Sequence, residues 1–192
     1  MTRQELEGKT YEEVANLFDQ ELDEYNKKVD EVMDQEVLNS MESDLMKEMD
    51  ENNTYLKQVE YELPNAVEFN GKRWTKNDIA AKIIYFLNKN EVEWSYTLGL
   101  FELVKLWKNK DFAKISYNLY DQTLRTLNQV KFKGYDEWES ILAVNEYMKL
   151  NHDNYTKDTA TILLTHQKHD AVLKRMQLIA KGDSENQENP TE

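Results

Sequence analysis

Residues 11–63 read YEEVANLFDQELDEYNKKVDEVMDQEVLNSMESDLMKEMDENNTYLKQVEYEL and lie in the longest stretch of the chain without glycine or proline. From Phe18 to Val32 the apolar residues recur at alternating steps of four and three. This spacing is typical of the apolar seam of a coiled coil, and the positions between are mostly acidic or basic. The stretch therefore predicts a long, acidic, coiled-coil-like N-terminal helix with at most one break.

The apolar seam of this helix is also its predicted interaction surface. After Val32 the repeat slips to steps of about four, and such a slip changes the supercoil locally. The seam consists of Phe18, Leu22, Tyr25, Val29, Val32, Val37, Met41 and Leu45, with Leu38 or Met49 as an alternative member of its second half.

The length of the predicted helix leaves three arrangements open. A continuous helix from Tyr11 to Asp50 would be roughly 60 Å long at about 1.5 Å per residue, which exceeds the width of a small domain. The apolar face could pack on the chain's own body, with a fold-back at the slip, or it could pair with a second copy. It could also dock on a helix of another protein.

Local signals mark the ends of this helix. Thr10 and Glu13 form a predicted capping box at its start. Residues 50–54, DENNT, are poor helix formers and predict a break. A second short helix is then expected over residues 55–63, ended by Pro64.

The charges divide the chain into three predicted parts. The net charge is −13, and residues 1–63 hold 6 Lys/Arg and 19 Asp/Glu. Residues 64–181 hold 18 Lys/Arg and 14 Asp/Glu, together with most of the aromatic residues. We therefore predict an acidic helical arm over 1–63, an aromatic-rich helical body over 64–181, and a disordered acidic tail over 182–192.

The composition and the missing motifs exclude several classes of function. The chain has no cysteine, which rules out disulfides, cysteine metal sites and thiol catalysis. Its five glycines form no phosphate-binding loop, and there is no GxSxG nucleophile motif. No apolar run reaches about 18 residues, and the N-terminus lacks a signal-peptide core. We expect no enzyme activity, no cofactor, no membrane contact, and a cytoplasmic location, or a virion if the protein is viral.

The body contains one clear β signal among helical patterns. Asn70-Gly71 lies between two short alternating segments and predicts a β-hairpin over residues 66–75. Residues 130–134 also alternate and leave a third short strand as an open alternative. The helices of the body are predicted over residues 75–87, 91–108, 112–128, 136–150 and 156–181. The predicted fold class is mainly α, with the N-terminal helix on a compact bundle of about five helices and a small β-hairpin.

The last predicted helix is the natural packing partner of the arm. Its apolar positions also step by four and three, and it is more basic in character than the arm, with Lys168, Lys174, Arg175 and Lys181. Its predicted interaction residues are His166, His169, Leu173 and Met176. His166 and His169 are also the best metal candidates, but two histidines without a neighbouring Glu-x-x-His partner are a weak signal, so we expect no metal site.

Three hypotheses for the function follow. The first is a non-enzymatic interaction or assembly protein that acts through residues 11–62, by self-association or with a protein partner. Its composition is compatible with a viral or phage structural or morphogenesis component. The second is an acidic mimic of nucleic acid that regulates a nucleic-acid-binding protein. The third is a metal-dependent protein using His166 and His169. Direct nucleic-acid binding is not expected, because the chain is strongly acidic.

Overall fold

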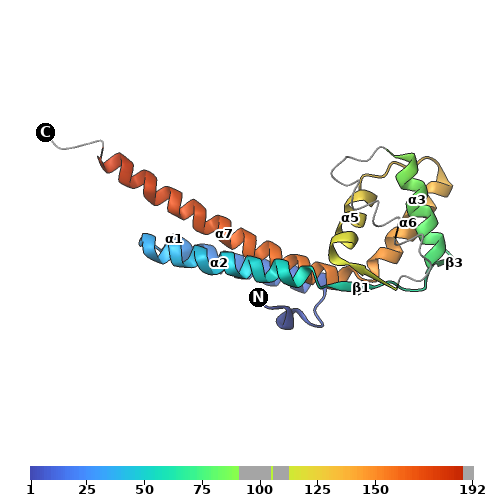
Figure 1. Ribbon diagram of the computed structural model, residues 1–192, viewed down its shortest axis with the longest axis horizontal. Helices are drawn as coiled ribbons and strands as arrows, with labels where there is room; N and C mark the ends of the chain where they lie inside the picture. The colour runs from blue at the N-terminus through green and yellow to red at the C-terminus, as the bar shows by residue number, and fades with distance from the viewer. Residues whose placement is uncertain (91–104, 106–112, 188–192) are drawn as a thin grey trace. The chain divides into compact units, whose positions relative to one another are not determined.

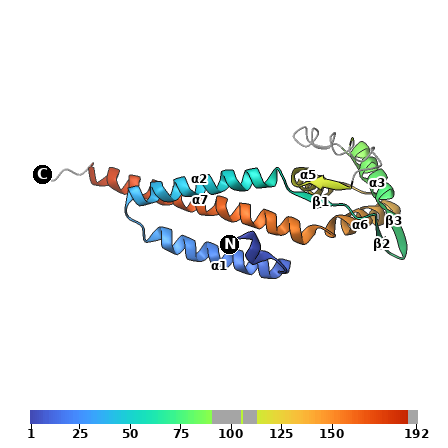
Figure 2. The same cartoon turned by 60° about the horizontal axis from the view of Figure 1, so that its bottom comes forward.

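The chain forms two compact units that are mainly helical. The computed structural model describes residues 1–90, 105 and 113–187, with the backbone alone for 182–187 (Figures 1 and 2). The first unit, called the helical unit, comprises Met1–Tyr55 and Thr156–Glu192. The second, called the mixed unit, comprises Leu56–Tyr155. The predicted helix over 91–108 lies outside the described residues except for Lys105, which is helical.

Three long helices build the helical unit: α1 (Tyr11–Asp30), α2 (Gln35–Leu56) and α7 (His152–Gln187), which belongs to this unit from Thr156 onward. Figures 1 and 2 show them lying side by side. Side-chain bonds join Glu21 to Lys168 and Glu48 to Thr165. Arg175 bonds Val32, further along α7 and just beyond the end of α1, so these two helices run parallel. Tyr55 bonds Asp158 at a point that is later in α2 but earlier in α7, so these two helices run antiparallel.

The acidic N-terminal stretch is two helices and not one. Thr10 caps α1 through the predicted capping box, since its side chain accepts from the Glu13 N–H and its own N–H bonds to the Glu13 carboxylate. α1 ends at Asp30, two residues before the predicted slip in the seam. Asp34 then accepts a hydrogen bond from the Glu36 N–H at 2.8 Å and supports the start of α2. The chain therefore folds back near the slip, as one of the three arrangements proposed.

The second half of the stretch corrects two predictions. Residues 50–54 do not break the helix, because α2 continues to Leu56. Asn52 and Tyr55 hydrogen-bond to side chains of α7, and these tertiary contacts outweigh the low helix propensity of the segment. The predicted helix over 55–63 is also wrong, since residues 60–62 form a β-strand.

The apolar seam closes a core between the three helices. Its fully buried members are Val29, Leu38, Leu45 and Val172, and Tyr25, Val32, Met41, Met176 and Ile179 pack around them. Leu38 is fully buried whereas Val37 is 45% exposed, so the alternative placement of Leu38 in the seam is the one observed. The seam is divided between two helices, and in the second helix, α2, Leu38 and not Val37 faces the core.

The boundaries of the units differ from the predicted arm, body and tail. Residues from Thr156 onward lie with α1 and α2 rather than with residues 64–155. α7 begins at His152 and continues past Gly182 to Gln187, so Gly182 does not end the helix. The predicted tail is thus helical over its first residues, and 188–192 lie outside the described residues.

The mixed unit contains two small antiparallel sheets. β2 (Ala66–Phe69) pairs with β3 (Lys72–Thr75), which confirms the predicted hairpin. Asn70 and Gly71 have φ values of 52° and 70°, the positive values that this two-residue turn requires. β1 (Glu60–Glu62) pairs with β4 (Lys114–Ser116), a sheet that the sequence patterns did not predict.

The third strand predicted over residues 130–134 is not formed. The Lys131 N–H donates to the Asn90 side chain at 3.0 Å, and the Lys133 N–H donates to the Glu137 carboxylate at 2.6 Å. Both backbone donors are thus bonded to side chains, so neither is available for a β-ladder.

Three described helices complete the mixed unit: α3 (Lys76–Lys89), α5 (Tyr117–Leu127) and α6 (Tyr135–Lys149). Thr75 caps α3 as predicted, through a reciprocal bond with Asp78. α5 begins later than the predicted 112, because Lys114–Ser116 are committed to β4 and Ser116 then caps the helix. α6 lies within one residue of its predicted bounds.

Tyrosines with bonded hydroxyls dominate the core of the mixed unit. Tyr120 is fully buried against Tyr61 and Tyr155, with ring centroids 5.0 and 5.1 Å away, and its hydroxyl donates to the Met148 carbonyl. Tyr147 is also fully buried and donates to the Pro64 carbonyl at 2.8 Å. Burial raises the pKa of Tyr120 and of Tyr147, so both stay neutral donors.

Substitutions at the adjacent positions Val37 and Leu38 test which residue of α2 faces the core of the helical unit. Leu38→Ala should lower the free energy of unfolding by about 2–5 kcal/mol, because it opens a cavity in a closed core. Val37→Ala, on the adjacent exposed position, should change it by about 0.5 kcal/mol or less. Urea unfolding of both variants measures this difference. Equal effects, or a larger effect at Val37, would show that the register is wrong.

One carboxylate of the mixed unit, Glu137, accepts three hydrogen bonds and predicts a pH effect. The hydrogen bond from Lys89, then those from the Tyr85 hydroxyl and the Lys133 N–H, lower the pKa of Glu137 from 4.5 to about 2. Because the folded pKa is lowered, these bonds stabilise the fold above the ordinary carboxylate pKa and are lost as the pH falls toward 2. In an NMR titration, Lys89→Ala should raise the pKa of Glu137, and Lys82→Ala should leave it unchanged. An unchanged value in Lys89→Ala would contradict the assigned cause.

Candidate functional site

The structure places the twelve predicted interaction residues at three levels of burial. Val29 and Leu45 are buried in the core of the helical unit, and Val37 and His166 are exposed. The other eight are partly buried: Phe18, Leu22, Tyr25, Val32, Met41, His169, Leu173 and Met176. Much of the seam is therefore occupied by contacts within the unit. That these residues also contact another protein remains a prediction.

The two histidines of α7 lie in different environments. His166 is exposed, whereas the side chain of His169 is only 18% exposed. Nε2 of His169 is 3.9 Å from a carboxylate oxygen of Glu42 on α2 and has no hydrogen-bond partner among the described residues. The structure therefore brings His169 to the boundary between α2 and α7 but does not bring the two histidines together around a common centre.

The net charge is concentrated in one of the two units. The mixed unit contains 14 Lys/Arg and 14 Asp/Glu, so its formal net charge is zero. The helical unit contains 10 Lys/Arg and 23 Asp/Glu and therefore carries the whole net charge of −13. The structure places the basic residues of α7 in the same unit as the acidic residues of α1 and α2, whereas the sequence division had assigned them to the body.

Basic side chains of α7 hold α1 in place. Lys168 pairs with Glu21, and its ammonium lies 5.2 Å from the centroid of the Tyr25 ring. Arg175 donates from Nε to the Val32 carbonyl at 2.9 Å, just beyond the end of α1. Burial alone would raise the pKa of Glu21, but the bonds from Lys168 and the N-terminal amino group outweigh it, and the pKa is lowered.

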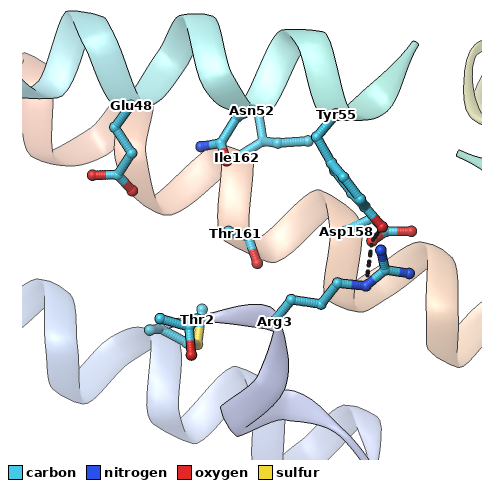
Figure 3. A pocket seen from close by; sticks show the side chains of 9 residues that line it. Thr2, Arg3, Glu48, Asn52, Tyr55, Asp158, Thr161 and Ile162 are labelled. Atoms are coloured by element: carbon cyan, nitrogen blue, oxygen red, sulfur yellow. Dashed lines mark hydrogen bonds and ion pairs between the residues drawn. The ribbon is translucent and has the colours of Figure 1, made fainter. Parts of the chain in front are cut away.

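A cavity of about 250 Å³ lies where the N-terminal segment η1 (Arg3–Leu6), the end of α2 and the first part of α7 meet (Figure 3). Its lining is Met1, Thr2, Arg3, Glu48, Asn52, Tyr55, Asp158, Thr161 and Ile162. All of these residues belong to the helical unit.

The cavity contains a buried carboxylate. The Asp158 side chain is fully buried, and its Oδ1 accepts a hydrogen bond from the Tyr55 hydroxyl at 3.2 Å. Nε of Arg3 lies 3.4 Å from the same oxygen, and the guanidinium carbon lies 4.7 Å from the centroid of the Tyr55 ring. In Figure 3 the Arg3 side chain extends from η1 toward this pair. The arrangement combines an aromatic face with a carboxylate, which is suited to hold an organic cation.

A polar network forms another side of the cavity. The Thr165 hydroxyl is buried and lies 2.8 Å from a carboxylate oxygen of Glu48. The Asn52 amide donates to the same hydroxyl at 3.2 Å. These bonds link α2 to α7 at the level of the cavity and fix where Glu48 and Asn52 lie.

A groove between α1 and α7 is a second hollow of the helical unit. Its volume is about 570 Å³, and it is lined by Leu22, Asn26, Asp30, Gln167, Asp170, Ala171, Lys174, Arg175 and Leu178. Leu178, one of its lining residues, is 59% exposed. Charged residues of both signs surround it, so the groove offers apolar contact within a polar rim.

The patterns in the sequence did not identify the cavity residues as a site. Asp158 stands four positions before Ile162, so it continues the apolar stripe of the last helix with a charged residue. A carboxylate in an apolar stripe signals a buried ion pair or a binding site. Arg3 gave no signal, because it precedes every periodic segment, and only the fold brings it to Asp158.

Comparisons with known proteins add no family to this picture. Neither the family models, nor the curated proteins, nor the solved structures include a match to this chain. Within the described residues, no helix combines the length and the apolar character needed to cross a bilayer. The same residues contain no group of three or more His, Asp or Glu side chains placed to hold a metal ion.

The polar network predicts a difference between two threonines of α7. Thr165→Val should lower the free energy of unfolding by about 1–2 kcal/mol, because it removes the hydroxyl that bonds Glu48 and Asn52. Thr161→Val should cost less than about 0.5 kcal/mol, since the Thr161 hydroxyl donates to the Lys157 carbonyl of its own helix and so links no second helix. Chemical unfolding measures both. A Thr165→Val variant as stable as Thr161→Val would contradict the role assigned to the network.

Proposed function

We propose that this protein is a non-enzymatic interaction or assembly protein and that its helical unit is the docking element. The observation that supports this proposal is the charge division, because the helical unit carries the whole net charge of −13 while the mixed unit is neutral. A unit with this field attracts a basic partner and accelerates its association.

The exposed apolar side chains of the helical unit provide the contact area. They are Tyr11, Met33, Val37, Met46, Leu163 and Leu178. Methionine adapts to irregular partner surfaces, so the proposed contact does not require a rigid complementary surface. The coiled-coil-like spacing of the seam extends the proposal, because a partner helix can pack beside Leu22 and Leu178 in the groove between α1 and α7.

An assembly role, as in a structural or morphogenesis component of a viral or phage particle, is the form of this proposal that we favour. The second form is an acidic mimic that occupies the nucleic-acid groove of a target protein. The same charge division supports it, since thirteen excess negative charges on the helical unit resemble a phosphate backbone in sign. The two forms differ in the identity of the partner.

The experiment compares two sets of charge-neutralising substitutions on the full chain. The test variant carries Asn at four exposed positions of the helical unit: Asp19, Asp23, Asp44 and Asp50. The control variant carries the corresponding amides at four exposed positions of the mixed unit: Glu62, Glu68, Asp136 and Asp153. Each tagged protein is used to capture partners from the cells in which it is naturally made.

Wild type and control should capture the same basic protein, and the test variant should not. With the captured protein purified, the test substitutions should slow association by about tenfold or more at low salt, and added salt should remove the difference. A partner from the same particle supports assembly, and a nucleic-acid-binding partner whose activity is inhibited supports mimicry. Equal capture by all three proteins would contradict docking through the helical unit.

A further inference from the structure

The cavity at Asp158 has the parts of a receptor for a guanidinium group. Such a group is planar and cationic, and it binds best where a carboxylate accepts its N–H groups and an aromatic ring covers its face. Tyr55 supplies the ring and Asp158 supplies a fully buried carboxylate. Glu48 and Asn52 add further acceptor oxygens to the lining, and the Thr161 hydroxyl adds another.

One guanidinium already occupies the edge of the cavity. Arg3 lies over the Tyr55 ring and beside Asp158, but its side chain is 54% exposed. Its Nε–Oδ1 distance of 3.4 Å is longer than the about 2.7–2.9 Å of a strong charge-assisted bond. Arg3 is one of several groups that contact the buried carboxylate, and it is half in solvent, so a better-placed guanidinium can compete with Arg3 for Asp158.

The segment that carries Arg3 is short and joined to α1 by a turn. η1 has four residues and is followed by Gly8 at a φ of 75°. Leu6 is fully buried and anchors the segment, whereas Thr2 and Glu5 are exposed. Arg3 can therefore leave Asp158 by a change of its own side chain while Leu6 stays in place.

The remaining space is large enough for a second head group. The cavity measures about 250 Å³ with Arg3 in position, whereas one water molecule needs about 10–15 Å³. Figure 3 shows the Glu48 carboxylate on the opposite side of the cavity from Asp158. A guanidinium that enters therefore meets a second acceptor beyond the one that Arg3 uses.

We propose that this cavity binds a guanidinium group and that Arg3 is its internal, replaceable occupant. The ligand is an arginine side chain presented by a protein or a small guanidinium compound. The proposal does not depend on docking through the acidic surface, because binding is measured with isolated probes. It assigns to Asp158 and Tyr55 a binding role in addition to the hydrogen bond by which they join α7 to α2.

The test uses three probes: acetyl-Gly-Arg-Gly amide, the same peptide with neutral citrulline in place of arginine, and agmatine. Arg3→Gln removes the internal guanidinium. Arg175→Gln is the matched control, because it removes an arginine of the same unit that bonds Val32 away from the cavity. Calorimetry measures affinity, and amide NMR shifts locate the bound probe in the full chain.

Arg3→Gln should bind the arginine peptide or agmatine about tenfold more tightly than wild type or Arg175→Gln, which corresponds to about 1.4 kcal/mol. Shifts should cluster at η1, the end of α2 and the start of α7. Preference for the peptide identifies a protein side chain as the source, and preference for agmatine identifies a small molecule. The citrulline peptide should bind at least about tenfold more weakly than the arginine peptide. Equal binding of the two peptides, or of Arg3→Gln and Arg175→Gln, overturns the proposal.

A second pair of variants tests the carboxylate. In the Arg3→Gln background, Asp158→Asn should weaken binding of the preferred probe about tenfold or more, and exposed Asp170→Asn should not change it. If Asp158→Asn does not fold, Tyr55→Leu replaces it and should weaken binding about two- to fivefold through loss of the aromatic face. Unchanged affinity in the variant that folds also overturns the proposal.

Discussion

The structure of the helical unit depends on the burial of one apolar stripe from α1 and α2 against α7. Val29, Leu38, Leu45 and Val172 form its closed centre. Most of the stability of a helix in a protein comes from tertiary packing of its apolar face, so each of these helices depends on the others. The hydrophobic contact must also overcome repulsion, because 23 acidic residues are brought into one unit.

The basic residues of α7 reduce this repulsion where the helices meet. Lys168 bonds Glu21 and lies near the Tyr25 ring, and Arg175 bonds the Val32 carbonyl after the end of α1. These contacts neutralise charge inside the unit and leave the acidic residues on its outer surface. A cavity with polar groups lies near the N-terminal segment. There Asp158 and Glu48 interrupt the apolar contact between α2 and α7, and Arg3 and Thr165 satisfy them.

Some features could be predicted from neighbouring residues because their causes are local. The capping boxes at Thr10 and Thr75 and the Asn70-Gly71 turn each depend on groups a few positions apart. Predictions failed where distant groups decided the outcome. Residues 50–54 remain helical because Asn52 and Tyr55 bond α7, and residues 130–134 are not a strand because Asn90 and Glu137 bond their amides.

By itself, the sequence determined the helical character of the chain and the hairpin at 66–75. It also determined the spacing of four and three residues in the seam and the position after Val32 where this spacing changes. These properties follow from spacing and from local backbone preference. Only the tertiary structure decided that the chain folds back near the slip, that Leu38 rather than Val37 faces the core, and that α7 is the third helix of the unit. It also brought Arg3 to Asp158, which are 155 positions apart in the chain. Contacts of this kind depend on which faces are buried together, and no local pattern of residues encodes that choice.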